Sequence, residues 1–221
     1  MLRGLFVTGT DTSVGKTTVS AALVHRYRHL GSLRYWKPIQ TGVEQDDDTA
    51  EVKRLGSCAD AEIFNQGVRL PHPVSPHLAS QLAGKSIDLH SFSALVKGCP
   101  ESDRWIIEGA GGVLVPINDS ELMIDLIRLL GLSILVVARS ELGTINHTLL
   151  TLASLRSHEL SVAGVVMVGE KNNHNRVAIE TYGKINVVGE MPYFDPLLVD
   201  SLKDWATKEL DNEERLLEFL L

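Results

Sequence analysis

A short apolar run, a glycine-bordered loop ending in Gly-Lys-Thr, and an amphipathic segment follow one another at the start of the chain. The run Leu5–Val7 is apolar and β-prone, as expected of a buried parallel strand. After it and the loop, the apolar residues take the spacing of one helix face, at Val19, Leu23, Tyr27 and Leu30. A strand, a loop and a helix in this order predict an anion site, because backbone N–H groups and the helix N-terminus point toward a phosphate.

The loop differs from the strict phosphate-loop template in its glycine spacing. The template has four residues between its glycines, whereas five separate Gly9 from Gly15, and Thr10 occupies the template position. Lys16 adds a positive charge, and the hydroxyl of Thr17 can hold Mg²⁺. We therefore favour a nucleotide loop over an ordinary βα turn. The residues expected to bind nucleotide here are Gly9, Ser13, Val14, Gly15, Lys16, Thr17 and Thr18.

The composition excludes several classes of function. The formal net charge is −7 at pH 7 and no stripe of Lys and Arg is present, so no nucleic-acid partner is expected. The longest apolar runs are too short to span a bilayer, and the first residues lack a signal-peptide pattern. Cys58 and Cys99 have no metal or redox spacing, which is typical of reduced thiols. We expect a cytoplasmic protein without a membrane partner, and a single P-loop α/β domain over residues 1–221.

Predicted strands and helices alternate along almost the whole chain. We expect further strands at 34–36, 105–107, 134–138, 162–168 and 187–188, and helices at 48–55, 122–130 and 144–156. Another helix is expected to begin at Ser75-Pro76, because serine suits the N-cap and proline the first helical position. Asp211 and Glu214 have capping-box spacing, so we expect an apolar helix at 216–221 that packs in the core or against another subunit. The alternation predicts an α/β fold, a doubly wound, mostly parallel sheet with helices on both faces.

Two charged residues directly follow predicted strands. Lys37 follows the strand at 34–36 and Glu108 follows the strand at 105–107, and ligands of doubly wound sheets gather at such strand ends. Most lysines in such places are simply solvated, but one beside a phosphate loop can neutralise a phosphoryl group during transfer. Glu108 precedes the glycine-rich run Gly109–Gly112, which lets the backbone approach a ligand closely. We therefore favour a functional role for Glu108 over that of a surface acid.

The acidic run Asp46–Asp48 has two interpretations that the sequence leaves open. It is either a solvated turn, in which Asp48 and Glu51 have the spacing of a helix cap, or part of a metal site. Mg²⁺ on a nucleotide needs few protein oxygens, so Thr17, Asp48 and Glu108 would be a sufficient set.

The histidines carry no clear catalytic signal. His77 and His147 each fall in the first turn of a predicted helix, where we favour packed, hydrogen-bonded histidines over catalytic ones. The hydroxyl of Thr41, on the same loop as Lys37, is placed to meet a polar substrate group. No Ser-His-Asp arrangement and no Cys/His metal cluster is visible in the sequence.

Several segments together resemble one family, the dethiobiotin synthetases of biotin biosynthesis. The first segment resembles the family's variant phosphate loop with its five-residue glycine spacing, and the second resembles its lysine motif. In chain order the segments are Gly9–Thr17, Lys37–Gly42, Ser75–His77, Glu108–Gly112, Leu142–His147 and Gly189–Pro192. The resemblance is specific, because other P-loop families share only the first motif. It implies a P-loop NTPase-like fold and a ligase that forms C–N bonds.

The resemblance implies a reaction of three steps. The substrate 7,8-diaminopelargonate (7,8-diaminononanoate) reacts with CO₂ to give a carbamate on one amine, and the γ-phosphoryl group of ATP is transferred to that carbamate. The second amine attacks the resulting carbamic–phosphoric anhydride, closes the urea ring of dethiobiotin and releases phosphate. The implied ligands are ATP as co-substrate, Mg²⁺ as cofactor, and CO₂ or bicarbonate. Phosphoryl transfer needs mostly positioning and charge neutralisation, so no protein nucleophile is required.

The resemblance also implies roles for individual residues. The catalytic residues would be Lys16 and Lys37, and the Mg²⁺ ligands would be Thr17, Asp48 and Glu108. Nucleotide contacts outside the first loop would come from Asp48, Glu108, Gly109, Ala110, Gly111, Met191 and Pro192. Substrate contacts would come from Thr12, Thr41, Leu142, Gly143, Thr144, Ile145 and Asn146. The residues from Leu142 to Asn146 act across subunits in the family, which implies a homodimer with shared active sites.

Two positions depart from the family pattern. Ser13 stands where some relatives carry an acid. The family commonly reads adenine with an asparagine just after the strand at 162–168, where this chain has Gly169-Glu170. The sequence therefore does not assign the residue that reads the base.

A nucleotide-switch ATPase of the partition or septum-placement type is the main alternative, because it shares this architecture. Such proteins usually carry an extra lysine near the start of the loop, where this chain has Thr10-Asp11. They often also have a basic or amphipathic partner-binding surface, which is not evident in this sequence. An accessory domain of an amidoligase or acetyltransferase is a second alternative, and the motifs at Lys37 and 142–146 count against it.

Overall fold

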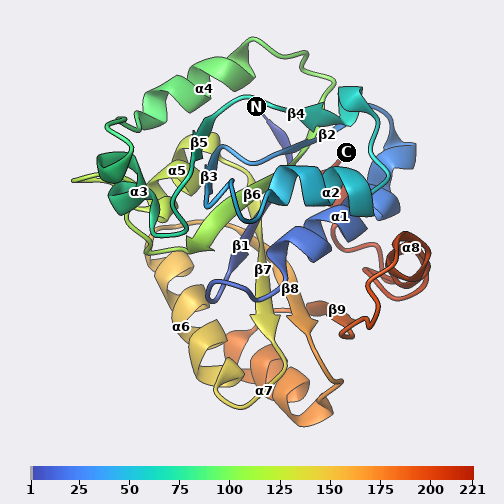
Figure 1. Ribbon diagram of the computed structural model, residues 1–221. Coiled ribbons are helices and arrows are strands. Elements are labelled where there is room, and N and C mark those ends of the chain that lie inside the picture. The colour runs from blue at the N-terminus through green and yellow to red at the C-terminus, as the bar shows by residue number, and fades with distance from the viewer. Residues whose placement is uncertain (1) are drawn as a thin grey trace.

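The computed structural model describes residues 2–221, which build a seven-stranded parallel sheet flanked by helices (Figure 1). The strands of this sheet are β1 (Arg3–Gly9), β2 (Leu33–Trp36), β4 (Ile63–Phe64), β6 (Arg104–Gly112), β7 (Ser133–Arg139), β8 (Val162–Val168) and β9 (Val187–Met191). Their order is β4-β2-β6-β1-β7-β8-β9. Two short strands, β3 (Ile39–Thr41) and β5 (Val68–Leu70), form a separate parallel pair.

The helices occupy the connections between these strands. They are α1 (Lys16–Tyr27), α2 (Asp48–Leu55), α3 (Pro76–Leu82), α4 (Leu89–Lys97), α5 (Met123–Leu130), α6 (Thr144–Ser157), α7 (Asn173–Gly183) and α8 (Val199–Lys208). The predicted strands are present, as are the helices expected at 48–55, from Ser75-Pro76, at 122–130 and at 144–156, whereas β3, β4, β5, α4, α7 and α8 are additional. Across residues 2–221 we find no helix with the length and apolar character that crossing a membrane requires.

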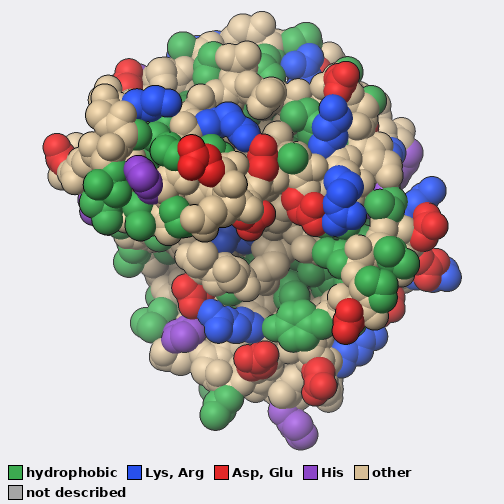
Figure 2. Space-filling view, in the orientation of Figure 1, with side chains coloured by type: hydrophobic (Ala, Val, Ile, Leu, Met, Phe, Trp, Pro, Cys, Tyr) green, Lys and Arg blue, Asp and Glu red, His purple; other side chains and the backbone are tan. Residues whose placement is uncertain are grey.

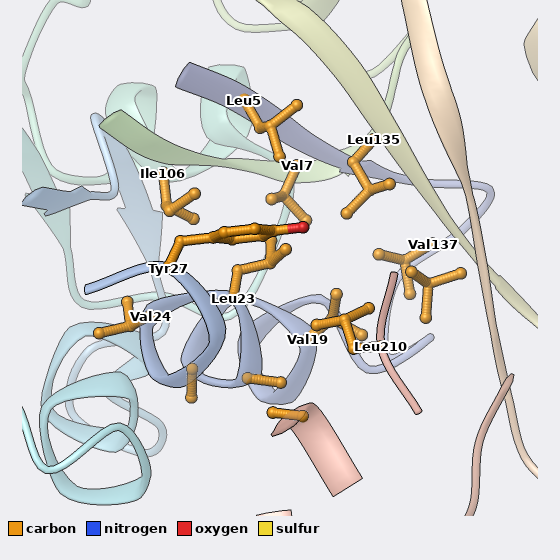
Figure 3. Close-up of a cluster of buried hydrophobic side chains, with 14 of the residues drawn as sticks. Leu5, Val7, Val19, Leu23, Val24, Tyr27, Ile106, Leu135, Val137 and Leu210 are labelled. Carbon is orange, nitrogen blue, oxygen red and sulfur yellow. The ribbon is translucent and has the colours of Figure 1, made fainter. Parts of the chain in front are cut away.

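Successive residues of each strand are buried on opposite faces of the sheet, which explains the continuous apolar runs in the sequence. On β1, Leu5 and Val7 contribute to the core beneath α1, α2 and α8, whereas Phe6 contributes to the core beneath α3 to α7. Figure 3 shows the first of these cores, where Leu23 and Tyr27 of α1 lie against the strands. Helices on both faces of a parallel sheet confirm the predicted doubly wound α/β class.

The strand order brings the phosphate loop and the predicted charged residues together. β6 lies between β1 and β2 in the sheet. Its register pairs Val7 of β1 with Glu108, and Trp36 of β2 with Ile107. Lys37, the next residue after Trp36, therefore lies beside Glu108 at the carboxyl ends of adjacent strands.

Three sequence-based expectations about element boundaries are wrong. The strand predicted at 187–188 continues to Met191, because β9 pairs with β8 as far as that residue. The strand predicted to end before Glu108 continues to Gly112, because Gly9 of β1 pairs with Gly112. The segment 216–221 is not an α-helix, and only Leu217–Phe219 form a 3₁₀ turn.

The expected capping box at Asp211 is also wrong, although the packing of the segment that follows is as expected. The Asp211 carboxylate instead accepts hydrogen bonds from the backbone N–H groups of Arg215 and Leu216. Leu216 and Leu220 are buried in the core beneath α1, which confirms core packing for this segment.

Candidate active site

The loop between β1 and α1 is tied to the sheet and folds around its lysine. The backbone N–H of Thr10 donates to the carbonyl of Val137 on β7 at 2.9 Å. A Cβ atom at position 9 would lie 2.6 Å from the carbonyl oxygen of Asp11, so Gly9 is required at the start of the longer loop. The same carbonyl accepts a hydrogen bond from Lys16 Nζ at 3.1 Å. The irregular glycine spacing therefore has a local structural cause.

Four predicted side chains meet beside the first turn of α1. The hydroxyl of Thr17 lies 2.8 Å from Asp48 Oδ1 and 3.0 Å from Glu108 Oε1. The ammonium of Lys37 lies 2.5 Å from Asp48 Oδ2 and 2.8 Å from Glu108 Oε1. We call Thr17, Lys37, Asp48 and Glu108 the carboxylate–lysine cluster. Its members come from α1, the end of β2, α2 and β6, so the convergence expected at the strand ends is confirmed.

Burial and charge determine how firmly the two lysines hold their protons. Lys37 is only 7% exposed and Glu108 is fully buried. Burial by itself lowers the pKa of Lys37, but the charges of Glu108 and Asp48 outweigh burial and raise that pKa above its ordinary value. Burial lowers the pKa of Lys16 to about 8, although Glu108 opposes this shift. Both lysines are therefore mostly cationic at neutral pH, and Lys16 holds its proton less firmly.

A second network fixes the start of α2 and thereby the position of Asp48. The N-cap residue is Asp47, whose Oδ1 accepts a hydrogen bond from the N–H of Ala50 at 3.1 Å. Gln40 of β3 donates to the same oxygen at 3.0 Å, and Arg69 of β5 donates to the other oxygen at 2.5 Å. The interpretation of Asp48 as a helix cap is therefore wrong, and its carboxylate points into the carboxylate–lysine cluster instead.

Two hydroxyls behind Glu108 are additions to the predicted site. Ser20 and Tyr35 donate to Glu108 Oε2 at 2.9 Å and 3.0 Å. Burial, and next the charge of Glu108, raise the pKa of Tyr35 well above its ordinary value, so its hydroxyl remains a donor. The sequence contains a signal for each, because Tyr35 lies two residues before Lys37 on one strand face and Ser20 lies four residues after Lys16 on one helix face.

The carboxylate–lysine cluster and the phosphate loop line a cleft of about 790 Å³. Figure 2 shows that the face drawn in Figure 1 is hollowed near its centre, with acidic and basic side chains around the hollow. The predicted site residues in the cleft lining are Thr12, Ser13, Gly15, Lys16, Thr17, Thr18, Lys37, Thr41, Asp48, Glu108, Ala110 and Gly111. The loop between β5 and α3, with Pro73 and Val74, also lines the cleft and was not predicted to do so.

The remaining predicted site residues do not line this cleft. They are Gly9, Val14, Gly109, Leu142, Gly143, Thr144, Ile145, Asn146, Met191 and Pro192. Val14 is buried in the core beneath α1, and Met191 is buried at the end of β9. Leu142 is fully exposed, whereas Thr144 at the start of α6 is buried. Within this chain the Leu142–Asn146 segment thus lies outside the lining of the cleft that contains the carboxylate–lysine cluster.

The two candidate histidines differ in their surroundings. His77 is half-buried in α3, and its Nδ1 lies 3.0 Å from the hydroxyl of Ser75, which confirms a hydrogen-bonded histidine. Ser75 is the N-cap residue of α3, as predicted, but its side chain pairs with His77 and makes no capping hydrogen bond. His147 is exposed on α6, so the interpretation of a packed histidine is wrong there.

The donors of the carboxylate–lysine cluster fit a magnesium ion. The Thr17 hydroxyl touches one oxygen each of Asp48 and Glu108, and oxygen is the ligand atom that Mg²⁺ prefers. Lys37 already places a positive charge against both carboxylates, which indicates that the site favours a cation. Within residues 2–221, no group of three or more His, Cys, Asp and Glu side chains is placed to hold a metal. The cluster instead offers two carboxylates and a hydroxyl, which suits an ion that takes other ligands from phosphate and water.

Comparisons with known proteins identify the family of the chain. Residues 3–199 match the family described as an AAA domain, to which the chain therefore belongs. The ATP-dependent dethiobiotin synthetase BioD of Paramagnetospirillum magneticum is 51% identical over 191 residues, which are 86% of this chain and 88% of the relative. The chain belongs to the dethiobiotin synthetase family. The resemblance predicted from the motifs is thus confirmed.

Other proteins of biotin biosynthesis are also similar to the chain over most of its length. The BioD protein of Brucella melitensis biotype 2 is 41% identical over 198 residues, 90% of each chain. The biotin biosynthesis bifunctional protein BioCD of Bordetella avium is 41% identical over 216 residues, which are 97% of this chain and 44% of the relative.

Solved structures of partition and septum-site proteins share the fold. A ParA family ATPase of Chlorobium tepidum superposes with a TM-score of 0.60 at 10% identity, covering 100% of this chain and 98% of that one. The septum site-determining protein MinD of Pyrococcus horikoshii, complexed with Mg-ADP, gives 0.56 at 15% identity, covering 100% and 95%. At such low identity the likeness confirms the P-loop NTPase-like architecture alone. It does not favour the switch-ATPase alternative over the synthetase family.

Proposed function

We propose that this protein is a dethiobiotin synthetase that uses MgATP to close the urea ring of 7,8-diaminopelargonate with CO₂. The observation that carries the proposal is the carboxylate–lysine cluster, in which Lys37 bridges Asp48 and Glu108 next to the phosphate loop. The family of the chain supports it, because the relatives that match most of its length are named for this activity.

The proposed reaction places charge where the lysines lie. One amine of the substrate attacks CO₂ and loses a proton, which gives a carbamate. A carbamate oxygen then attacks the γ-phosphorus, ADP leaves, and a carbamic–phosphoric anhydride forms. The second amine attacks the carbonyl carbon, its proton is lost and phosphate leaves. Lys16 and Lys37 would neutralise the negative oxygens of the nucleotide and the carbamate during these steps.

Thr17, Asp48 and Glu108 would hold the magnesium ion. When bound, the ion supplies positive charge to the phosphate oxygens and orients them. Thr12 and Thr41, which line the same cleft, would contact the diamine or the carbamate. Ala110 and Gly111 bring backbone to the cleft wall, where a side chain would take the space of a ligand.

We further propose a homodimer in which Leu142–Asn146 of each subunit complete the site of the other. Leu142 is fully exposed, so the apolar surface of its side chain is available for burial against a second subunit. The N-terminus of α6, a helix of 14 residues, has the polarity to bind the substrate carboxylate. A fully active protein that sediments as a monomer would contradict this arrangement.

The proposed activity has a direct test. Purified protein, 7,8-diaminopelargonate, labelled bicarbonate and MgATP should give acid-stable label in dethiobiotin, with one ADP formed per ring because each closure uses one phosphoryl transfer. Omission of the diamine should stop ADP formation. ATP hydrolysis that proceeds equally without the diamine would contradict the synthetase proposal and favour a switch ATPase.

We expect the protein to discriminate only weakly between ATP and nucleotides with other bases. Gly169 has a φ of +128°, and a Cβ atom there would lie 2.4 Å from Ser140 Oγ, so the asparagine that reads adenine in the family would be strained at this position. A two-bond contact to adenine discriminates by about 1–3 kcal/mol. Without it, we expect CTP and GTP to support turnover within about 10-fold of ATP, since about 1.4 kcal/mol corresponds to that factor. Rates with the three nucleotides at equal Mg²⁺ measure this, and a preference for ATP of more than 100-fold would show that another group reads the base.

A further inference from the structure

We infer that Tyr35 is a positioning residue for Glu108. Its hydroxyl orients the Glu108 carboxylate so that one oxygen faces the place in the cleft where a metal ion would bind. The inference rests on the proposed function, because it assumes that Glu108 holds a nucleotide-bound metal ion. It concerns a tyrosine that does not line the cleft and therefore acts through Glu108.

The two oxygens of Glu108 have different neighbours. Oε2 accepts hydrogen bonds from the neutral hydroxyls of Tyr35 and Ser20, at 3.0 Å and 2.9 Å. Oε1 lies 3.0 Å from the hydroxyl of Thr17 and 2.8 Å from the ammonium of Lys37. Oε2 is thus held by two neutral donors, and Oε1 faces Thr17 and the Lys37 ammonium. Rotation of the carboxylate would break both bonds behind it.

Burial makes the Tyr35 hydroxyl irreplaceable by solvent. Tyr35, Ser20 and Glu108 are each 0% exposed. A buried carboxylate oxygen that loses a donor cannot recover it from bulk water, so the group reorients toward the donors that remain. For Glu108 that reorientation would be toward the Lys37 ammonium, which competes with a metal ion for the same oxygen. The loss of one hydroxyl would therefore appear as weaker metal binding.

A purely structural role for Tyr35 has a matched control within the chain. Tyr27 is 2% exposed, and its hydroxyl donates to the buried Asp211 carboxylate at 2.5 Å. Tyr27 lies ten residues after Thr17 on α1, about 15 Å along the helix. Tyr35→Phe and Tyr27→Phe thus each remove one buried hydroxyl that donates to a carboxylate. Only the Tyr35 hydroxyl donates to a carboxylate of the active site, Glu108.

The test measures metal binding without turnover. Mn²⁺ is titrated into protein and ADP, and the free ion is followed by its electron paramagnetic resonance signal. We expect Tyr35→Phe to weaken Mn²⁺ binding about 10- to 100-fold, which is the usual range for a partner of a metal ligand. Tyr27→Phe should bind Mn²⁺ like the wild type although its melting temperature falls. In turnover assays Tyr35→Phe should raise the Mg²⁺ concentration for half-maximal rate more than it lowers kcat.

Three results would overturn the inference. The first is wild-type Mn²⁺ affinity in folded Tyr35→Phe, and the second is an equal loss of affinity in Tyr27→Phe; either leaves the proposed function intact. If Tyr35→Phe does not fold, Ser20→Ala removes the other donor to Oε2 and should also weaken Mn²⁺ binding, so unchanged affinity there would be the same contradiction. The third is wild-type protein that binds no Mn²⁺ with ADP, which would overturn the proposed function and the inference with it.

Discussion

Replacement of Lys37 by alanine should abolish ring closure in a protein that still folds. The ammonium is fixed by Asp48 and Glu108 at the end of the cleft where the phosphoryl group would be transferred. Loss of one group that stabilises transition-state charge costs about 10²- to 10³-fold in kcat, and a group that touches both carbamate and phosphoryl oxygens should lie at or beyond the upper end. The measurement is dethiobiotin formed per enzyme under saturating substrates. Near-normal turnover of folded Lys37→Ala would remove Lys37 from the mechanism.

The same variant should lose stability in a way that magnesium reverses. Removal of one partner from a buried ion pair costs about 3–5 kcal/mol, because the remaining charge stays buried without compensation. Since Asp48 and Glu108 would both hold Mg²⁺, its addition with ADP should compensate their charge and raise the melting temperature of Lys37→Ala more than that of the wild type. Lys53→Ala is the control, because Lys53 forms an exposed pair with Asp60 on the outside of α2. It should change neither activity nor the response to magnesium.

The parts of the fold that the sequence predicted well are those in which local pattern and tertiary packing agree. The helix at 48–55 and the strand at 162–168 have the predicted boundaries. The seven residues of the strand at 162–168 form a continuous run without charged or polar side chains, and such a run predicts a strand buried on both faces of a sheet. The phosphate loop was similarly clear, because its strand and helix are adjacent in the chain.

Errors arose where a distant partner decides the local structure. Glycines have low strand propensity, so the run Gly109–Gly112 predicts that the strand at 105–107 does not continue, but pairing with β1 extends β6 to Gly112. At the C-terminal segment the Asp211 carboxylate bonds to Tyr27 on α1 as well as to nearby backbone, and this long-range anchor replaces the expected helix cap.

The candidate site shows the same division. Lys37, Asp48 and Glu108 were predictable, since each is a charged residue next to a strand or helix end. Tyr35 was not predicted, because an aromatic residue in a strand is ordinary core until the neighbouring strand is known. Its spacing from Lys37 becomes informative once the order β2-β6-β1 places its hydroxyl against Glu108.

Replacement of Glu108 by glutamine should have the second large effect. The carboxylate is fully buried and contacts Thr17, Lys37 and the two hydroxyls behind it. Glutamine keeps the size but removes the charge, so the cluster loses one of its two anions and the proposed metal ion loses a ligand. We expect turnover to fall by about 10³-fold or more, which corresponds to about 4 kcal/mol of lost transition-state stabilisation. The measurements are turnover at saturating MgATP and Mn²⁺ affinity in the presence of ADP.

The control for Glu108→Gln is Asp211→Asn, because Asp211 is also a buried carboxylate that accepts a hydrogen bond from a buried tyrosine. It should lower the melting temperature without changing Mn²⁺ affinity.

A double-mutant comparison then separates the roles of Tyr35 and Glu108 at the active site. If Tyr35 acts only through the Glu108 carboxylate, Tyr35→Phe should have little further effect on Mn²⁺ binding once Glu108 is glutamine. Additive losses of Mn²⁺ affinity would mean that Tyr35 affects the metal site by a route other than Glu108. Equal activity of Glu108→Gln and wild type would show that Glu108 is not part of the metal site.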